Sequence, residues 1–368
     1  MIVALHVAPP SHDRMLPMKD DADAERTTVA PYDPFVGQVL ARRYRVEQRL
    51  AVGGFGAVYR ARDLFDRRDV AVKVVNANHA GNAGVAARFR REAAALRRLN
   101  HRHTVAMYEL GETDAGTLFI AMELLRGKSL WDEFQLQGRL PWWRTLKIVR
   151  MVCSALAQAH ALDIIHRDLK PENIHLERDG DELDFVKVVD FGIAKILRGS
   201  SDETSDLTHS GQMIGTFDYM APEQMVSGDV GPACDIFTLG VVSYEMITGA
   251  RPFGTPGTTS AMLNAILHST PAPISTRAAA PRELDPIVAR CLMRDPGKRY
   301  AYADELGADL ERVLASVPET DEDRTETKIR PATTGSFAAE EATTNWEEGE
   351  LVKPATTLPG ILPPWLRR

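Results

Sequence analysis

The chain has 368 residues and a formal net charge of −7 at pH 7. Its 44% hydrophobic and 26% charged residues are typical of a globular protein, which excludes a chain that is disordered, collagenous or coiled-coil throughout. The acidic balance argues against nucleic-acid binding driven by overall charge. The three cysteines stand far apart and form no CxxC motif, which favours a reducing compartment and a cytoplasmic location.

The composition divides the chain into three parts. Residues 1–43 mix acids, prolines and small residues without periodicity, so we expect a flexible leader. Residues 44–315 have the patterning of a globular domain. Residues 316–368 contain nine threonines and six prolines, which favours a disordered tail. No run approaches the ~20 apolar residues of a membrane span, and no basic stretch precedes the apolar start, so we expect no signal peptide.

The first half of the globular part is predicted to be rich in β-structure. Strand-like stretches occupy residues 44–50, 57–62, 70–75, 105–110 and 118–123. One helical pattern interrupts them, with apolar side chains spaced helically from Val85 to Leu99. The sequence therefore predicts a small N-lobe over residues 44–125.

The second half is predicted to be mainly helical. Helical segments fit residues 142–161, 234–248, 259–268 and 283–293, and short strand-like pieces lie at 174–177 and 186–189. A β-rich lobe followed by a helical C-lobe, residues 126–315, is an α+β arrangement with a cleft between the lobes.

A glycine-rich segment runs from Leu50 to Val58 between two predicted strands. Glycines at such a turn let the backbone approach a phosphate closely, with free N–H groups to donate. An ordinary glycine-rich hairpin turn is the alternative interpretation.

Lys73 ends the apolar stretch Val70-Ala71-Val72. A lysine on an apolar strand is costly unless its charge is paired. Glu92, on the predicted helix, is an available partner. A lysine held in this way can present its ammonium to polyphosphate oxygens, and a surface lysine is the alternative.

Two further segments carry chemically suitable groups. In the segment from His166 to Asn173, Asp168 can accept a proton, Lys170 can steady a phosphoryl oxygen and Asn173 can bind a metal. Asp190-Phe191-Gly192 follows a strand-like stretch, and an aspartate there suits Mg²⁺ bound to phosphates. Taken alone, the second segment is equally compatible with a simple turn.

In their order and context, these segments match the signature set of protein kinases. The chain resembles a bacterial eukaryotic-like (Hanks-type) serine/threonine protein kinase over residues 44–315. Ala221-Pro222-Glu223 matches the motif that closes the activation segment. Asp235 matches the buried aspartate that holds the catalytic loop, and Arg299 matches the arginine that pairs with Glu223.

The resemblance implies a two-lobed kinase fold, an ATP-dependent phosphotransferase activity, and ATP with Mg²⁺ as cofactors, Mn²⁺ being an alternative metal. Its catalytic residues would be Asp168, Lys170, Lys73 and Glu92. Its metal ligands would be Asn173 and Asp190. Its nucleotide-binding residues would be Val52, Gly53, Gly54, Phe55, Gly56, Val58, Ala71, Lys73, Met122, Glu123, Leu125 and His175.

The resemblance also bears on acceptors and partners. Lys170 and Thr216 match the serine/threonine class, so the partners would be proteins with serine or threonine acceptors. Thr208 and Ser210 lie where related kinases autophosphorylate. We leave open whether the threonine-rich tail recruits a phosphothreonine-binding partner, and whether the chain forms a homodimer. No nucleic-acid or membrane partner is expected.

The chain departs from the family pattern at two positions. Ala51 stands where the first glycine of the nucleotide loop is usual, and His175 stands where an apolar residue usually lies under the adenine ring. Two other functions therefore stay open: an inactive kinase-like scaffold, and an adaptor that acts through its phosphorylated tail. The retained Lys73, Asp168 and Asp190 favour an active enzyme.

Overall fold

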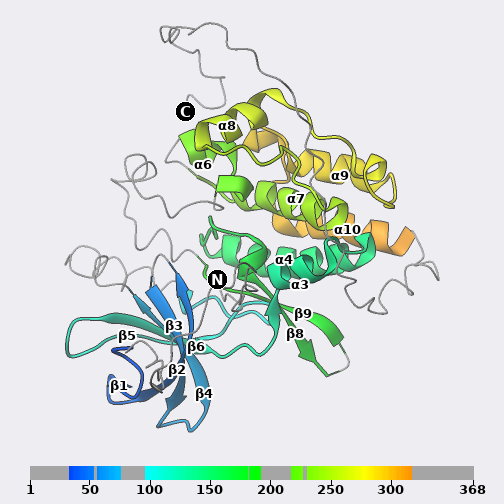
Figure 1. Ribbon diagram of the computed structural model, residues 1–368. Coiled ribbons are helices and arrows are strands. Elements are labelled where there is room, and N and C mark those ends of the chain that lie inside the picture. Colours follow the sequence, from blue (N-terminus) through cyan, green and yellow to red (C-terminus); the bar gives the residue numbers. More distant parts are fainter. Residues whose placement is uncertain are drawn as a thin grey trace, which may run out of the picture.

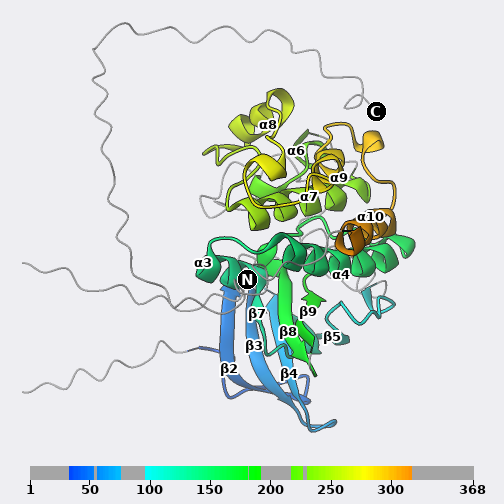
Figure 2. The same cartoon turned by 90° about the vertical axis from the view of Figure 1, so that its right-hand side faces the viewer.

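The computed structural model describes residues 33–53, 56–75, 96–180, 182–191, 217–226 and 230–316. These residues form a β-rich lobe and a helical lobe, which Figure 1 shows at the lower left and the upper right. The view in Figure 2 separates the strands β2, β3 and β4 from the helices above them. The α+β, two-lobed prediction is therefore confirmed.

The N-lobe is an antiparallel sheet with the strand order β1-β2-β3-β4-β6-β5. Its strands are β1 (Val39–Leu40), β2 (Tyr44–Gly53), β3 (Gly56–Asp63), β4 (Asp69–Val75), β5 (Met107–Glu112) and β6 (Leu118–Glu123). Strand β4 pairs on both sides and is buried along almost its whole length, which explains its near-continuous valine and alanine sequence. Lys73 is the one buried charged residue in this strand.

The ordered N-lobe begins earlier than residue 44. Strand β1 pairs with the start of β2, and Phe35 packs against Tyr59 with ring centroids 5.7 Å apart. Asp33 forms an ion pair with Arg49 at 2.9 Å. Part of the segment that we expected to be a flexible leader is thus tied to the sheet by tertiary contacts.

The C-lobe is built from helices and short 3₁₀ turns. Its helices are α3 (Leu130–Gln137), α4 (Trp142–Ala161), α6 (Pro222–Val226), α7 (Ala233–Thr248), α8 (Thr259–His268), α9 (Leu284–Cys291) and α10 (Ala303–Ser316). The 3₁₀ turns are η1 (Pro171–Asn173), η3 (Phe217–Tyr219), η4 (Ile274–Thr276) and η5 (Pro296–Lys298). Every residue from Cys234 to Ile247 of α7 is buried, so this helix is the centre of the lobe. Helices α4 and α9 pack directly against it.

A small sheet lies between the two lobes. It has the order β7-β8-β9, with β7 at Lys128–Ser129, β8 at Ile174–Asp179 and β9 at Glu182–Val188. One of its faces, with Ile174 and Val188, belongs to the large hydrophobic core of the C-lobe. The backbone N–H of Val105 donates to the carbonyl of Val188 at 3.0 Å, which attaches the small sheet to the N-lobe.

Candidate active site

The predicted nucleotide loop is the turn between β2 and β3. Gly56 has φ +145°, and a Cβ built there would lie 1.9 Å from the carbonyl oxygen of Val74. Only glycine fits that position. A Cβ at Gly53 would make only an ordinary contact, with the carbonyl oxygen of Gly56 at 3.9 Å, and the side chain of Val52 is 57% exposed. Gly54 and Phe55, also predicted here, lie outside the described residues.

Lys73 lies on β4 between Val58 of β3 and Ile120 of β6. It is 8% exposed, and its Nζ forms an ion pair with Oδ1 of Asp190 at 2.7 Å. Burial alone would raise the pKa of Asp190, but the Lys73 ammonium outweighs it and lowers the pKa to about 2. Asp190 is therefore a carboxylate at neutral pH. Glu92, the predicted partner of Lys73, lies outside the described residues, and the ion pair with Asp190 was not predicted.

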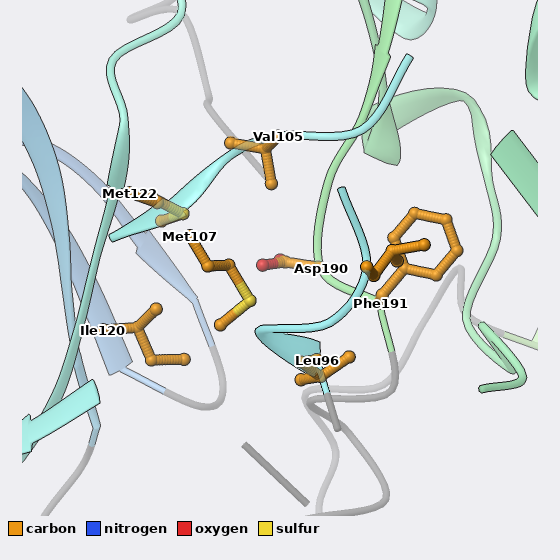
Figure 3. A pocket seen from close by; sticks show the side chains of 8 residues that line it. Leu96, Val105, Met107, Ile120, Met122, Asp190 and Phe191 are labelled. Atoms are coloured by element: carbon orange, nitrogen blue, oxygen red, sulfur yellow. The ribbon is translucent and has the colours of Figure 1, made fainter. Parts of the chain in front are cut away.

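An apolar pocket lies beside this ion pair. It is lined by Leu96, Leu99, Val105, Met107, Ile120, Met122, Asp190 and Phe191. Figure 3 shows the Asp190 carboxylate directed into the pocket toward Met107. Apolar walls exclude water, which strengthens the attraction between Lys73 and Asp190.

The catalytic-loop candidates lie together, directly before β8. Lys170 Nζ is 3.2 Å from Oδ2 of Asp168. Asn173 Nδ2 donates to the backbone carbonyl of Asp168 at 2.7 Å. The Asp168 carboxylate is thereby kept beside a cation and an amide, with 22% of its side chain exposed for a substrate.

A buried aspartate holds this loop from below. Asp235 of α7 accepts the backbone N–H groups of His166 and Arg167, each at 2.9 Å. His160 Nε2 lies 2.9 Å from the same carboxylate. Burial alone would raise the pKa of Asp235, but its hydrogen bonds and the neighbouring His160 lower it. Arg167 has φ +66°, so the loop is held in a conformation that non-glycine residues rarely adopt.

The end of the activation segment is anchored in the same lobe. Arg299 donates to both oxygens of Glu223, at 2.7 and 2.9 Å, and the pair is buried. Gln224 Nε2 donates to the carbonyl of Arg167 at 2.8 Å, which links this segment to the catalytic loop. The sequence-predicted pairing of Arg299 with Glu223 is present. Thr208, Ser210 and Thr216 lie outside the described residues.

The predicted hinge residues follow β6. Met122, Ala71 and Val105 form a buried cluster that Val58, Leu124 and Val189 extend; we call it the hinge cluster. Glu123 accepts Lys187 Nζ at 2.9 Å and the backbone N–H of Ala106 at 3.1 Å. Leu125 is half-buried. Three of the residues predicted to bind the nucleotide, Val58, Ala71 and Met122, thus lie in one cluster.

His175 lies on β8, two residues after Asn173. It is 3% exposed, and burial lowers its pKa to about 4, so the imidazole is neutral at physiological pH. A neutral imidazole can fill a position under a purine ring that usually holds an apolar side chain.

Sequence reasoning missed two contacts of this site. His160, which supports Asp235, sits eight residues before Asp168 at the end of a helix, and its spacing gives no signal by itself. Lys187, which binds the hinge residue Glu123, is a lysine within an apolar strand-like stretch. The reasoning applied to Lys73, that a lysine on an apolar strand needs a partner, would have singled it out.

The donor set fits a magnesium-bound nucleotide. Asn173 and Asp190 offer oxygen ligands, and Lys73 offers a cation for phosphates. In the described part of the chain, no cluster of three or more His, Cys, Asp or Glu side chains could hold a metal alone. Mg²⁺ is commonly bound by one or two protein side chains together with substrate phosphates and water.

Known proteins that are similar to this chain identify its family. The family model of the protein kinase domain matches residues 44–309. This chain belongs to the protein kinase family. The serine/threonine-protein kinase pkn3 of Myxococcus xanthus is 38% identical to it over 283 residues, which cover 76% of this chain and 52% of that protein. The serine/threonine-protein kinase PknL of Mycobacterium tuberculosis is 36% identical over 281 residues, or 76% and 68% of the two chains.

A solved kinase domain has the same fold. The crystal structure of the Mycobacterium tuberculosis PknI kinase domain aligns with a TM-score of 0.57 and 27% identity, covering 75% of this chain and 98% of that one. The chain spans between about half and two thirds of the length of the curated relatives named above. In the ranges that the structure describes, no helix of this kinase is long and apolar enough to cross a membrane.

Proposed function

We propose that this chain is an ATP-dependent protein kinase that transfers the γ-phosphoryl group to serine and threonine hydroxyls of protein substrates. The observation that carries the proposal is the geometry of the catalytic loop. Asp168 lies beside Lys170 and Asn173, and Asp190, two residues after β9 in the same lobe, reaches Lys73 across the cleft. An inactive scaffold would not require these polar and charged side chains to be held in contact with one another.

Each residue has a step to perform. Asp168 orients the acceptor hydroxyl and takes its proton as the phosphoryl group is transferred. Lys170, 3.2 Å from Asp168, stabilises the negative charge that develops on the phosphoryl oxygens. Lys73 binds the phosphates of the nucleotide, and the backbone around Gly53 covers them. Because the transition state is loose, positioning and electrostatics supply most of the rate.

Bound Mg²⁺·ATP supplies the phosphoryl group and a cationic charge on the phosphates. Asn173 and Asp190 are the residues that would hold the metal. The low pKa of Asp190 keeps it a carboxylate, which is the form that a hard cation binds. We propose Mg²⁺ as the metal used, with Mn²⁺ as a substitute.

The acceptor class and the regulation rest on the resemblance to the family. Lys170 is the residue typical of serine/threonine kinases, and an arginine in the place of Arg167 is typically paired in the family with a phosphate on the activation segment. We propose autophosphorylation at Thr208 and Ser210. Recruitment of a phosphothreonine-binding partner by the tail, and a homodimer, stay predictions.

The test is phosphoamino-acid analysis after incubation of the purified chain with Mg²⁺ and labelled ATP. We expect label on serine and threonine, and peptide mapping should place part of it at Thr208. Lys73→Met should abolish labelling. A matched control is Asp179→Asn, since Asp179 is an exposed carboxylate at the far end of β8.

Label on tyrosine alone would contradict the proposed acceptor class. Absence of label in the wild type, with nucleotide binding intact, would favour the scaffold function. Full activity of Thr208→Ala would show that phosphorylation of this residue is not needed to order the segment.

A further inference from the structure

The side chain of His175 faces away from the C-lobe core. Its neighbours on β8, Ile174 and Leu176, both belong to the large core cluster. Successive side chains of a strand point to opposite faces, so His175 points to the other face of the small sheet. That face is turned toward the N-lobe.

The strand register places His175 beneath the hinge. It pairs with Ser129 of β7 on one side and with Lys187 of β9 on the other. Lys187 shares its face and reaches Glu123 of the hinge, with 2.9 Å between Nζ and Oε2. Val189, two residues beyond Lys187, belongs to the hinge cluster. His175 therefore lies on the face of β8 that it shares with Lys187, the partner of the hinge residue Glu123; β8 is the central strand of the β7-β8-β9 sheet, which Figure 1 shows beside the N-lobe.

The polar neighbours of His175 already have partners. Ser129 Oγ donates to Asp132 at 2.7 Å and accepts the backbone N–H of Asp132 at 3.0 Å, as the N-cap of α3. Lys187 is bound to Glu123. The Nδ1 atom of His175 is different, because it is buried and has no hydrogen-bond partner among the residues that the structure describes. Buried polar atoms without a partner are rare and costly in folded proteins.

A bound nucleotide can supply the missing partner. The hydrogen-bonding atoms of a purine lie in the plane of the ring, where the hinge backbone would meet them. A side chain below the ring meets only its face and the attached sugar. Building on the function proposed above, we propose that Nδ1 of His175 forms a hydrogen bond with a hydroxyl of the nucleotide ribose. His175 is then a determinant of the preference for ribonucleotides over deoxyribonucleotides.

The test compares the dissociation constants of ADP, 2′-deoxy-ADP and 3′-deoxy-ADP by calorimetry in the presence of Mg²⁺. For the wild type, we expect one of the two deoxynucleotides to bind about tenfold more weakly than ADP, as loss of one hydrogen bond in a buried site predicts. His175→Leu should bind ADP about tenfold more weakly than the wild type, and should bind all three nucleotides equally. His175→Asn, whose amide nitrogen can occupy the place of Nδ1, should recover part of the discrimination.

Circular dichroism and thermal unfolding without nucleotide would show that each variant is folded. Discrimination in His175→Leu equal to that of the wild type would overturn the proposal, and so would equal wild-type affinity for all three nucleotides. In either case, the measured binding of ADP would leave the kinase function standing. A wild type that binds none of the three would instead contradict the proposed function itself.

Discussion

The two walls of the cleft are held in place by different forces. The upper wall, the turn from Gly53 to Gly56, is supported by strand pairing and by the close approach of Gly56 to Val74. The lower wall, the catalytic loop, is supported by charged groups buried in the helical lobe. Asp235 holds its backbone, and the pair of Glu223 with Arg299 anchors the segment beside it.

This difference separates the expected effects of substitution. Changes in the lower wall remove buried charges or their partners, so they should lower both stability and the rate of the chemical step. Changes in the upper wall should chiefly alter nucleotide affinity, because this wall contributes backbone groups rather than reacting ones. The following substitutions test that division.

Asp235→Ala should have the largest effect. It leaves two backbone N–H groups and His160 without their acceptor inside the core. We expect kcat to fall by roughly 10²-fold or more, because small displacements of catalytic groups cost that much. The free energy of unfolding should fall by about 3 kcal/mol or more. Steady-state kinetics and urea unfolding check both, with Asp304→Ala on the exposed side of α10 as control. An unchanged kcat would contradict the account of how the loop is held.

Substitutions in the buried ion pair of Glu223 and Arg299 should have the next largest effect. Glu223→Met leaves the Arg299 charge without its carboxylate, and we expect a loss of about 3–5 kcal/mol in the free energy of unfolding. Arg299→Met should cost more, since Arg299 also donates to the backbone carbonyls of Met293, Ala233 and Arg294. A double-mutant cycle by chemical denaturation measures the coupling. Additive effects of the two substitutions would mean that the pair is not coupled.

The upper wall offers a matched pair of glycines. Gly56→Ala forces a Cβ into the carbonyl of Val74 at a φ that only glycine adopts readily, whereas the methyl group of Gly53→Ala would have its nearest neighbour, the Gly56 carbonyl oxygen, at 3.9 Å. We expect Gly56→Ala to lower stability by about 1–3 kcal/mol and to weaken nucleotide binding. Gly53→Ala should leave stability nearly unchanged. Thermal unfolding and ADP titration of the two variants measure these effects. Equal stabilities of the two variants would contradict the requirement for glycine at residue 56.

The smallest expected effect is a pH-dependent loss of stability on substitution in the N-lobe. The hydrogen bond from Arg43 lowers the pKa of the buried Asp63 from its usual 3.8 to about 2. Because the folded-state pKa is depressed, this contact stabilises the fold above about pH 4, and the contribution is lost as the pH falls toward 2. Arg43→Met should therefore cost about 2 kcal/mol at neutral pH and little near pH 2. Unfolding curves of the wild type and Arg43→Met between pH 2 and pH 7 measure this loss of stability. A loss that does not change with pH would show that it does not come from the ionisation of Asp63.

The long elements of the fold were predictable from the sequence. The helices expected at 142–161 and 259–268 coincide with α4 and α8, because each carries a continuous helical pattern of apolar residues. The order of residues 33–43 was not predictable, since it depends on contacts of Asp33 and Phe35 with residues brought near only by folding. Helix α10 was also missed, although its buried Leu306, Leu310 and Val313 have helical spacing.

The candidate site was predictable wherever a short motif fixes it. Asp168, Lys170 and Asn173 lie within six residues, so local geometry brings them together. Lys73 pairs with Asp190, 117 positions away, although the sequence indicated Glu92 as its partner and Asp190 only as a metal ligand. The partnership of Glu123 with Lys187, and the orphaned Nδ1 of His175, arise from the register of β8 and β9 with the hinge. No sequence pattern by itself predicts that register.

We expect Asp168 to take the proton of the acceptor hydroxyl, and the site to bind nucleotide without it. The most direct measurement is single-turnover phosphoryl transfer together with ADP affinity, in the wild type and in Asp168→Asn. The account predicts ADP affinities that agree within about twofold, and transfer slower by roughly 10²–10⁴-fold in the variant, the range that general-base catalysis contributes. Transfer by Asp168→Asn at the wild-type rate would contradict it.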